Sequence, residues 1–182
     1  NLDSRSTQDR ITMSTDTPQD EVRKQNLTVG FIGLGAMGFP MAGHLQTAGY
    51  ATTVFNRSPD KASRWQETYG GKTALTPAAS ARDADVVFVC VGNDDDVREV
   101  TLGNQGVLET LKPGSLLIDH TTASADLAQE LQSACMEKDI GFLDAPVSGG
   151  QAGAELGQLT IMVGGDSTSF DSAKAVMAVY GK

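Results

Sequence analysis

The sequence lacks a basic face and any long apolar run. Its 182 residues carry 14 Lys and Arg against 23 Asp and Glu, which gives a formal net charge of −9. Nucleic acid is therefore not an expected partner, because contact with phosphates needs a positively charged surface. No apolar stretch approaches the roughly 18 residues of a membrane-spanning helix, so a membrane partner is not expected either.

Cysteine and histidine are also scarce, with two of each in the chain. Cys90 and Cys135 lie within apolar patterns, so we interpret them as small core residues of a cytoplasmic protein and not as disulfide partners. His44 and His120 are far apart, with no spaced Cys or carboxylate around them. A metal site is therefore not expected.

The chain divides into two parts by composition. Residues 1–26 are polar with few large apolar side chains, which predicts a flexible tail. From 27 to 182, apolar runs alternate with helical patterns, which predicts a doubly wound, Rossmann-type α/β fold with a mostly parallel sheet. Strands are expected at 27–32, 51–55, 72–74, 86–91, 115–119, 140–145 and 159–163, with a glycine-rich loop at 149–153 and a last helix from 167 to 180.

A glycine-rich turn follows the first expected strand. Gly33-x-Gly35-x-x-Gly38 leads directly into an apolar stripe at helical spacing. Strand, turn and helix in this order are typical of a dinucleotide site, with Gly33 in the tight turn, Gly35 open to a pyrophosphate and Gly38 at a close helix–strand contact. Free N–H groups at the helix start favour a phosphate there. A purely structural glycine turn is the alternative.

The end of the second expected strand indicates which dinucleotide binds. An acidic residue at this place usually bonds the ribose hydroxyls of NAD. Here Asn56-Arg57-Ser58 stands instead, with no carboxylate until Asp60. Because a guanidinium pairs well with phosphate, we predict NADP(H) in preference to NAD(H), which the same site can also take. The alternative is that Arg57 is only a solvated residue after a strand.

Four ordered segments resemble the β-hydroxyacid dehydrogenase family, which includes 3-hydroxyisobutyrate dehydrogenase, tartronate and succinic semialdehyde reductases and, more distantly, 6-phosphogluconate dehydrogenase. The segments are Phe31–Gly49, Val89–Val97, Asp119–Thr122 and Asp144–Gly150. The resemblance covers residues 27 to 182. It implies an NAD(P)-dependent oxidoreductase that acts on a small β-hydroxy acid or the corresponding semialdehyde, with this chain as its cofactor-binding domain.

The resemblance also implies a site. Its cofactor-binding residues would be Gly33, Leu34, Gly35, Ala36, Met37, Gly38, Asn56, Arg57, Ser58, Val91, Gly92, Val97 and Thr122. Thr122 would lie beside nicotinamide and substrate, and Ser148, Gly149 and Gly150 would bind the substrate carboxylate. Such a hydroxyl with two glycine N–H groups also forms a plausible carboxylate nest on chemical grounds alone. The alternatives are an ordinary glycine turn and, for Thr122, a place in the capping sequence before Ser124.

The departures from the family pattern concern catalysis. The family's acid–base lysine lies in a glycine-rich stretch that opens a separate all-helical domain, through which family members form homo-oligomers. The sequence ends at Lys182, and neither Lys174 nor Lys182 has the required glycines before it. We therefore assign no catalytic residue, and expect the chain alone to bind NADPH without turnover. His120 stands where the family has other residues and receives no role, while His44 is interpreted as a structural surface residue.

Three other functions are weaker. A regulatory module that binds NADPH without chemistry is the main alternative. A short-chain reductase is disfavoured, because Tyr50, Tyr69 and Tyr180 have no lysine four residues later. A P-loop phosphotransferase is disfavoured because no Gly-Lys-Ser/Thr follows the glycines.

Overall fold

A seven-stranded sheet lies at the centre of the molecule. The computed structural model describes residues 26–182, so the predicted tail falls, apart from Asn26, outside the described residues. The strand order is β3-β2-β1-β4-β5-β6-β9, and neighbouring strands are parallel except for β6 and β9. This confirms the predicted doubly wound fold. The strands are β1 Thr28–Ile32, β2 Ala51–Phe55, β3 Lys72–Thr73, β4 Val86–Val89, β5 Leu116–Asp119, β6 Gly141–Asp144 and β9 Gly164–Gly165.

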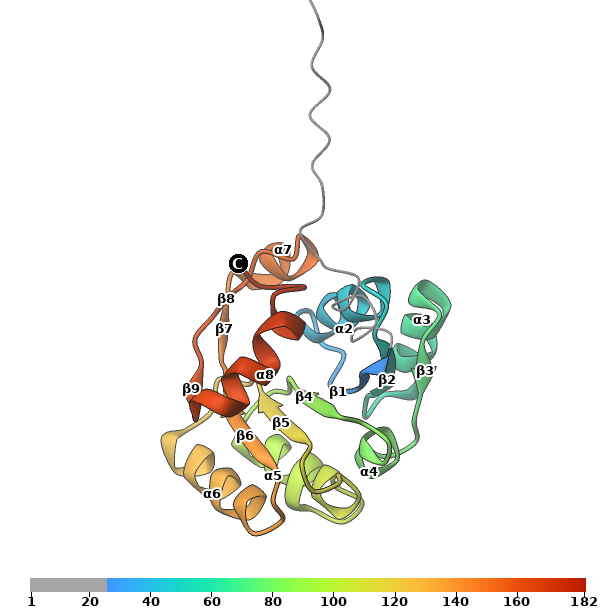
Figure 1. Ribbon diagram of the computed structural model, residues 1–182. Helices are drawn as coiled ribbons and strands as arrows, with labels where there is room; N and C mark the ends of the chain where they lie inside the picture. Colours follow the sequence, from blue (N-terminus) through green and yellow to red (C-terminus); the bar gives the residue numbers. More distant parts are fainter. Residues whose placement is uncertain (1–25) are drawn as a thin grey trace, which may run out of the picture.

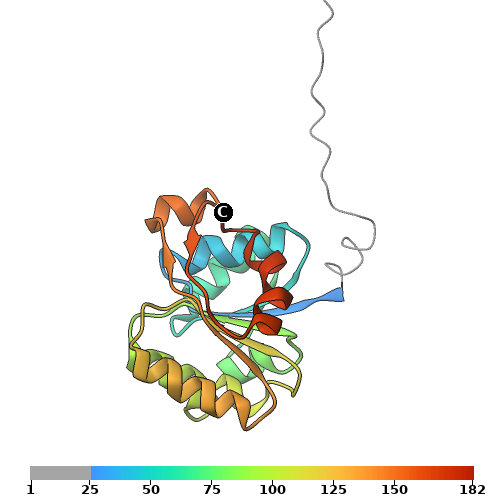
Figure 2. The same cartoon turned by 60° about the vertical axis from the view of Figure 1, so that its left-hand side comes forward.

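Helices cover both faces of this sheet (Figures 1 and 2). One layer holds α2 Gly38–Thr47, α3 Pro59–Tyr69, α7 Gly150–Glu155 and α8 Ser167–Met177. The other holds α4 Pro77–Ala81, α5 Asp94–Leu102, the 3-10 turn η1 Val107–Glu109 and α6 Ala125–Met136. Within residues 26–182, no helix is both long enough and apolar enough to cross a bilayer.

The central strands hold the two layers together because their side chains alternate between the faces. Phe31 packs into the core with α2 and α8, whereas its neighbour Ile32 packs into the core with α5 and α6. Both are fully buried. Phe31 also stacks on Phe88 of β4, with ring centroids 5.9 Å apart. Each fully buried side chain of this size contributes about 2–3 kcal/mol of apolar burial, so the sheet is stabilised from both sides.

Helix starts follow the capping residues in the sequence. The Thr76 hydroxyl accepts a hydrogen bond from Ala79 N at 3.0 Å, and the Ser124 hydroxyl accepts one from Leu127 N at 3.2 Å. Ser58 precedes Pro59 at the start of α3 but makes no side-chain cap. These caps satisfy N–H groups that have no partner within the helix.

Three predictions about the last third of the chain are wrong. The segment expected to be a loop at 149–153 forms the short helix α7, because the positive φ angles are confined to Gly149 (136°) and Gly150 (61°) at its start and Ala152 and Ala154 follow within the helix. The strand expected at 159–163 is divided. Thr160–Ile161 (β8) pairs antiparallel with Val147–Ser148 (β7) in a separate small sheet, and β9 then joins the edge of the main sheet. The last helix ends at Met177, three residues earlier than expected.

Candidate functional site

An open cavity of about 640 Å³ lies where β1, β2 and β4 end. Because β2 and β4 lie on opposite sides of β1, the chain order reverses here, and such a point is where open α/β sheets bind ligands. The cavity is lined by Ile32, Gly33, Gly35, Ala36, Met37, Gly38, Phe55, Asn56, Arg57, Ser58, Lys61, Leu75, Thr76, Pro77, Cys90, Val91, Gly92, Asp96, Glu99, Val100, Asn104 and Gln105.

The three glycines have three different surroundings. Gly33 has φ +98°, a conformation that other residues rarely adopt, and its N–H donates to Phe55 O at 2.9 Å. A Cβ on Gly38 would collide with the carbonyl oxygen of Gly33, so only glycine lets α2 begin so close to β1. A Cβ on Gly35 would have nothing within 4 Å. The backbone at Gly35 is therefore open to a ligand in the cavity.

Asn56 connects this turn to the end of β2. Its side-chain oxygen accepts a hydrogen bond from Leu34 N at 2.8 Å, and its side-chain nitrogen donates to Ser58 O at 3.1 Å. Both polar ends of the amide are thus used within the protein. Asn56 lines the cavity, and in this structure it also fixes the glycine turn relative to Arg57 and Ser58.

Ten of the predicted cofactor residues lie together on the cavity wall, namely Gly33, Gly35, Ala36, Met37, Gly38, Asn56, Arg57, Ser58, Val91 and Gly92. Leu34 is buried and borders a second cavity of about 510 Å³, which shares Gly35 and Ala36 with the first. Val97, which the resemblance places at the cofactor, does not line the cavity, because its side chain is fully buried in the core between α5 and the sheet.

The predicted substrate residues lie outside this cavity. Thr122 is exposed in the loop after β5, and Ser148, Gly149 and Gly150 are exposed between β7 and the first turn of α7. β5 and β6 are neighbours in the sheet, so the segments that follow them start from the same edge.

Buried polar groups hold the loop after β5. Thr121 accepts a hydrogen bond from Val91 N through its hydroxyl at 3.1 Å, and its own N–H donates to the Asp119 carboxylate at 2.9 Å. Burial raises the pKa of Asp119 to about 6. Hydrogen bonds from Thr121 oppose this shift, and the negative charge of Asp144 adds to it. The cavity wall at Val91 is thus connected to β5.

His120 has a structural place that the sequence did not reveal. Its Nδ1 lies 2.6 Å from Ala145 O and its Nε2 lies 2.8 Å from the hydroxyl of Tyr180. A carbonyl oxygen only accepts, so Nδ1 carries the proton and Nε2 accepts from Tyr180. The ring also stacks on Phe88 at 5.4 Å, and burial lowers the pKa of His120 to about 4. His120 is therefore neutral and connects β5 to the end of the chain.

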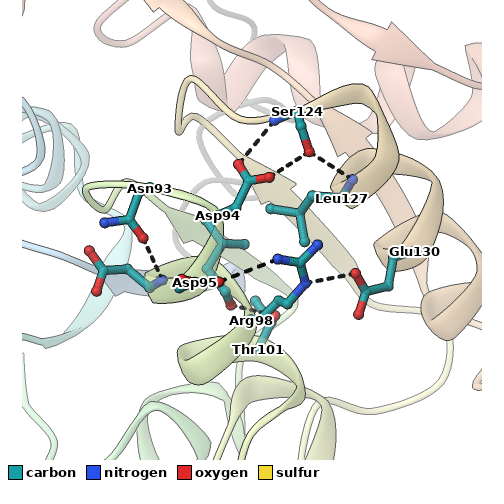
Figure 3. A network of polar contacts seen from close by, with 10 residues as sticks. Asn93, Asp94, Asp95, Arg98, Thr101, Ser124, Leu127 and Glu130 are labelled. Carbon is teal, nitrogen blue, oxygen red and sulfur yellow. Dashed lines mark hydrogen bonds and ion pairs between the residues drawn. The ribbon is translucent and has the colours of Figure 1, made fainter.

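A second polar network joins α5 to α6 (Figure 3). Ser124 donates to the Asp94 carboxylate through its backbone N–H at 3.0 Å and through its hydroxyl, and these bonds lower the pKa of Asp94. Arg98 donates to Glu130 at 2.8 Å and lies 3.5 Å from Asp95. The first turn of α6, just after Thr122, is thereby held against the first turn of α5.

The remaining titratable groups of the core have no evident chemical role. Cys90 and Cys135 are both free, as predicted, and burial raises the pKa of each thiol to about 12. His44 Nε2 lies 2.9 Å from Ala154 O and 3.0 Å from Glu155 O, so it connects α2 to the end of α7. In the part of the chain that the structure describes, no three His, Cys, Asp or Glu residues are grouped to hold a metal ion.

Several lining residues were not predicted. Leu75, Thr76 and Pro77 reach the cavity from the start of α4, and Asp96 and Glu99 reach it from α5. Only Asp96 had a visible signal in the sequence, as the last of three consecutive aspartates. Its orientation depends on how α5 packs, and the sequence alone does not give that.

Comparison with known proteins shows to which family the chain is similar. Residues 28–182 match the family described as the NAD-binding domain of 6-phosphogluconate dehydrogenase. The chain is 56% identical over 154 residues to an uncharacterized oxidoreductase of Shewanella frigidimarina. The aligned region covers 85% of this chain and 53% of that protein.

Two solved structures agree with this. A Mycobacterium tuberculosis 3-hydroxyisobutyrate dehydrogenase with L-serine has a TM-score of 0.79 at 34% identity, covering 85% of this chain and 52% of that one. A protein called Psf3, in complex with NADP+ and 2-OPP, has a TM-score of 0.79 at 30% identity, covering 84% and 54%. The chain therefore spans about half the length of the proteins it matches.

The surroundings of the glycines generate a first prediction. Gly38→Ala should lower the free energy of unfolding by about 2 kcal/mol or more, because its methyl group has no room against the Gly33 backbone. Gly35→Ala should change it by less than about 0.5 kcal/mol, because its methyl group enters open space. Urea unfolding of both variants without ligand measures the difference, and equal losses would contradict the assignment.

Asp119 generates a second prediction. Its pKa in the folded protein is about 6, above the ordinary value of 3.8, because the fold favours the neutral carboxyl group. The stability that this neutral group provides is complete below pH 3.8 and is lost as the pH rises through 6. Asp119→Asn, which resembles the neutral form, should be more stable than the wild type at pH 7.5 by up to about 3 kcal/mol. The gain should vanish near pH 4.

Urea unfolding at several pH values measures this gain. The exposed Asp126 of α6 provides a control for the amide substitution itself, with Asp126→Asn measured at the same pH values. A gain for Asp119→Asn that is the same at every pH would contradict the role of burial.

Proposed function

The chain belongs to the family of NAD-binding domains of 6-phosphogluconate dehydrogenase, and from this premise we propose that it is the cofactor-binding part of an NADP-preferring oxidoreductase. Its substrate would be a small β-hydroxy acid or the corresponding semialdehyde. The neighbour named as 3-hydroxyisobutyrate dehydrogenase was solved with L-serine, which itself carries a β-hydroxyl and a carboxylate. That chemistry supports the substrate class.

One observation carries the proposal. The open backbone at Gly35 and the guanidinium of Arg57 line the same cavity, which continues from the glycine turn to the end of β2. The open backbone of the turn before α2 suits a pyrophosphate, and Arg57 suits a further phosphate at the ribose. The residues present therefore fit a phosphorylated dinucleotide.

Each part of the chain has one task in this proposal. The turn from Gly33 to Gly38 would hold the pyrophosphate, while Arg57 and Ser58 would hold the phosphorylated ribose, with Asn56 fixing their position. Val91 and Gly92 form the wall toward β4. When bound, a nicotinamide dinucleotide supplies hydride donor and acceptor chemistry.

The substrate end is proposed on the loops that follow β5 and β7. The Thr122 hydroxyl would bind beside the nicotinamide, and the Ser148 hydroxyl with the N–H groups of Gly149 and Gly150 would bind the carboxylate. The exposure of these groups in the structure leaves them accessible to a small acid. Holding the substrate near the hydride carrier is a major source of rate acceleration. A cytoplasmic location and homo-oligomers of the complete enzyme remain predictions.

Arg57 tests the cofactor preference. Arg57→Asp should raise the dissociation constant of NADPH by at least about tenfold, because a charge-assisted contact to phosphate is worth about 1.5–3 kcal/mol. It should change that of NADH by less than about threefold. Fluorescence titration of the chain with each nucleotide measures both constants.

Arg82→Asp is the matched control for this experiment. Arg82 is exposed and follows α4, and it is not among the residues that line the cavity. The control makes the same change in net charge, so it should leave both constants nearly unchanged. Equal effects of Arg57→Asp on NADPH and NADH would refute the predicted preference.

Turnover separates an enzyme from a regulatory module. We expect residues 1–182 to bind NADPH but to oxidise or reduce no substrate measurably, because no described residue matches the family's acid–base lysine. Robust reduction of a semialdehyde by this chain would overturn that expectation. A complete gene product that binds NADPH and is inactive on a panel of β-hydroxy acids and semialdehydes would favour the regulatory module.

A further inference from the structure

Arg57 has an acidic partner across the mouth of the cavity. Its Nη1 lies 3.4 Å from Oδ1 of Asp96, which belongs to the first turn of α5. The Arg57 side chain is 81% exposed and that of Asp96 only 26%, so the carboxylate is the better fixed of the two. The two residues are 39 positions apart and meet because β2 and β4 lie on either side of β1.

The three consecutive aspartates at the start of α5 have different tasks. Asp94 accepts hydrogen bonds from Ser124 of the next helix, and Asp95 pairs with Arg98 on the same helix. Asp96 is the only one of the three among the cavity-lining residues. Its second carboxylate oxygen lies over Gly92, where a Cβ would approach to 2.8 Å. Both oxygens of Asp96 are thus directed to cavity-lining residues.

Charges on the cavity wall are balanced. Arg57 and Lys61 are its two cations, and Asp96 and Glu99 are its two anions. A site adapted only to a phosphorylated ribose would have an excess of positive charge, because phosphate carries close to two negative charges at neutral pH. On this wall, Arg57 therefore favours a ribose phosphate and Asp96 opposes it.

We propose that Asp96 is a specificity-determining residue that weakens the binding of NADP(H) and supports that of NAD(H). This inference rests on the proposed cofactor site. Asp96 competes with a 2′-phosphate for the Arg57 guanidinium, and its own charge repels that phosphate. A ribose 2′-hydroxyl has no charge to repel and is able to donate a hydrogen bond to a carboxylate.

The experiment compares Asp96→Asn with Asp95→Asn. The two variants lose the same charge at neighbouring positions, but the Asp95 side chain is 97% exposed and does not line the cavity. Fluorescence titration gives dissociation constants for NADPH and NADH. Calorimetry with adenosine 2′,5′-bisphosphate and with AMP isolates the contribution of the 2′-phosphate. Thermal unfolding checks that each variant is folded, and Asp96→Ala provides a second removal of the carboxylate.

Asp96→Asn should tighten NADPH and the bisphosphate about tenfold, as expected for the loss of one unit charge a few ångströms from a phosphate at a surface site. NADH and AMP should bind unchanged or up to about threefold more weakly, and Asp95→Asn should change every constant less than about twofold. Weaker NADPH binding would show instead that Asp96 positions Arg57. Equal tightening of both nucleotides, or no change, would also overturn the proposal. Failure of the wild-type chain to bind any of these ligands would instead reject the proposed cofactor site.

Discussion

The close contact between the Gly38 and Gly33 backbones is the constraint on which the rest of the site depends. It lets α2 start close against the turn that follows β1, so Ala36, Met37 and Gly38 line the cavity at the start of the helix. Gly33 N bonds to Phe55 O of β2, and Cys90 N, just after β4, bonds to Ile32 O, both at 2.9 Å. The three strands therefore end together, and everything attached to their ends meets around one turn.

Behind the cavity, the site is supported by buried polar contacts in addition to apolar packing. Asp119, His120 and Thr121 are buried in succession, and a buried polar group without a partner would cost about 1–3 kcal/mol. Each has a partner, and Trp65 Nε1 is the one buried side-chain nitrogen or oxygen without a hydrogen bond among the described residues. Directional bonds of this kind fix the loop before Thr122 in one conformation more strictly than apolar contacts alone would.

Sequence patterns predict the fold well where a feature depends only on residues that are neighbours in the sequence. The apolar strands, the cap at Thr76 and the glycine turn all follow from neighbouring residues, and the structure and the family match agree with the predicted architecture. The sequence failed where partners are distant. The glycines of α7 predict a loop where the structure has a helix, and the sequence indicates no role for His120 because its partner Tyr180 lies 60 residues away. The motif position of Val97 does not tell which way its side chain points on α5, and in the structure it points into the core.

The choice between the two cofactors also depends on residues that are distant in the sequence. The usual inference considers the end of β2 alone, and there Arg57 indicates a phosphorylated ribose. The electrostatic potential at the ribose also depends on α5, which is distant in sequence and adjacent in space. A guanidinium paired with a carboxylate is a weaker phosphate site than a free one, because the carboxylate offsets its positive charge and occupies one of its N–H donors. In the proposed site, the balance between the two dinucleotides would thus depend on both β2 and α5, and a motif in one of these elements would give only half of it.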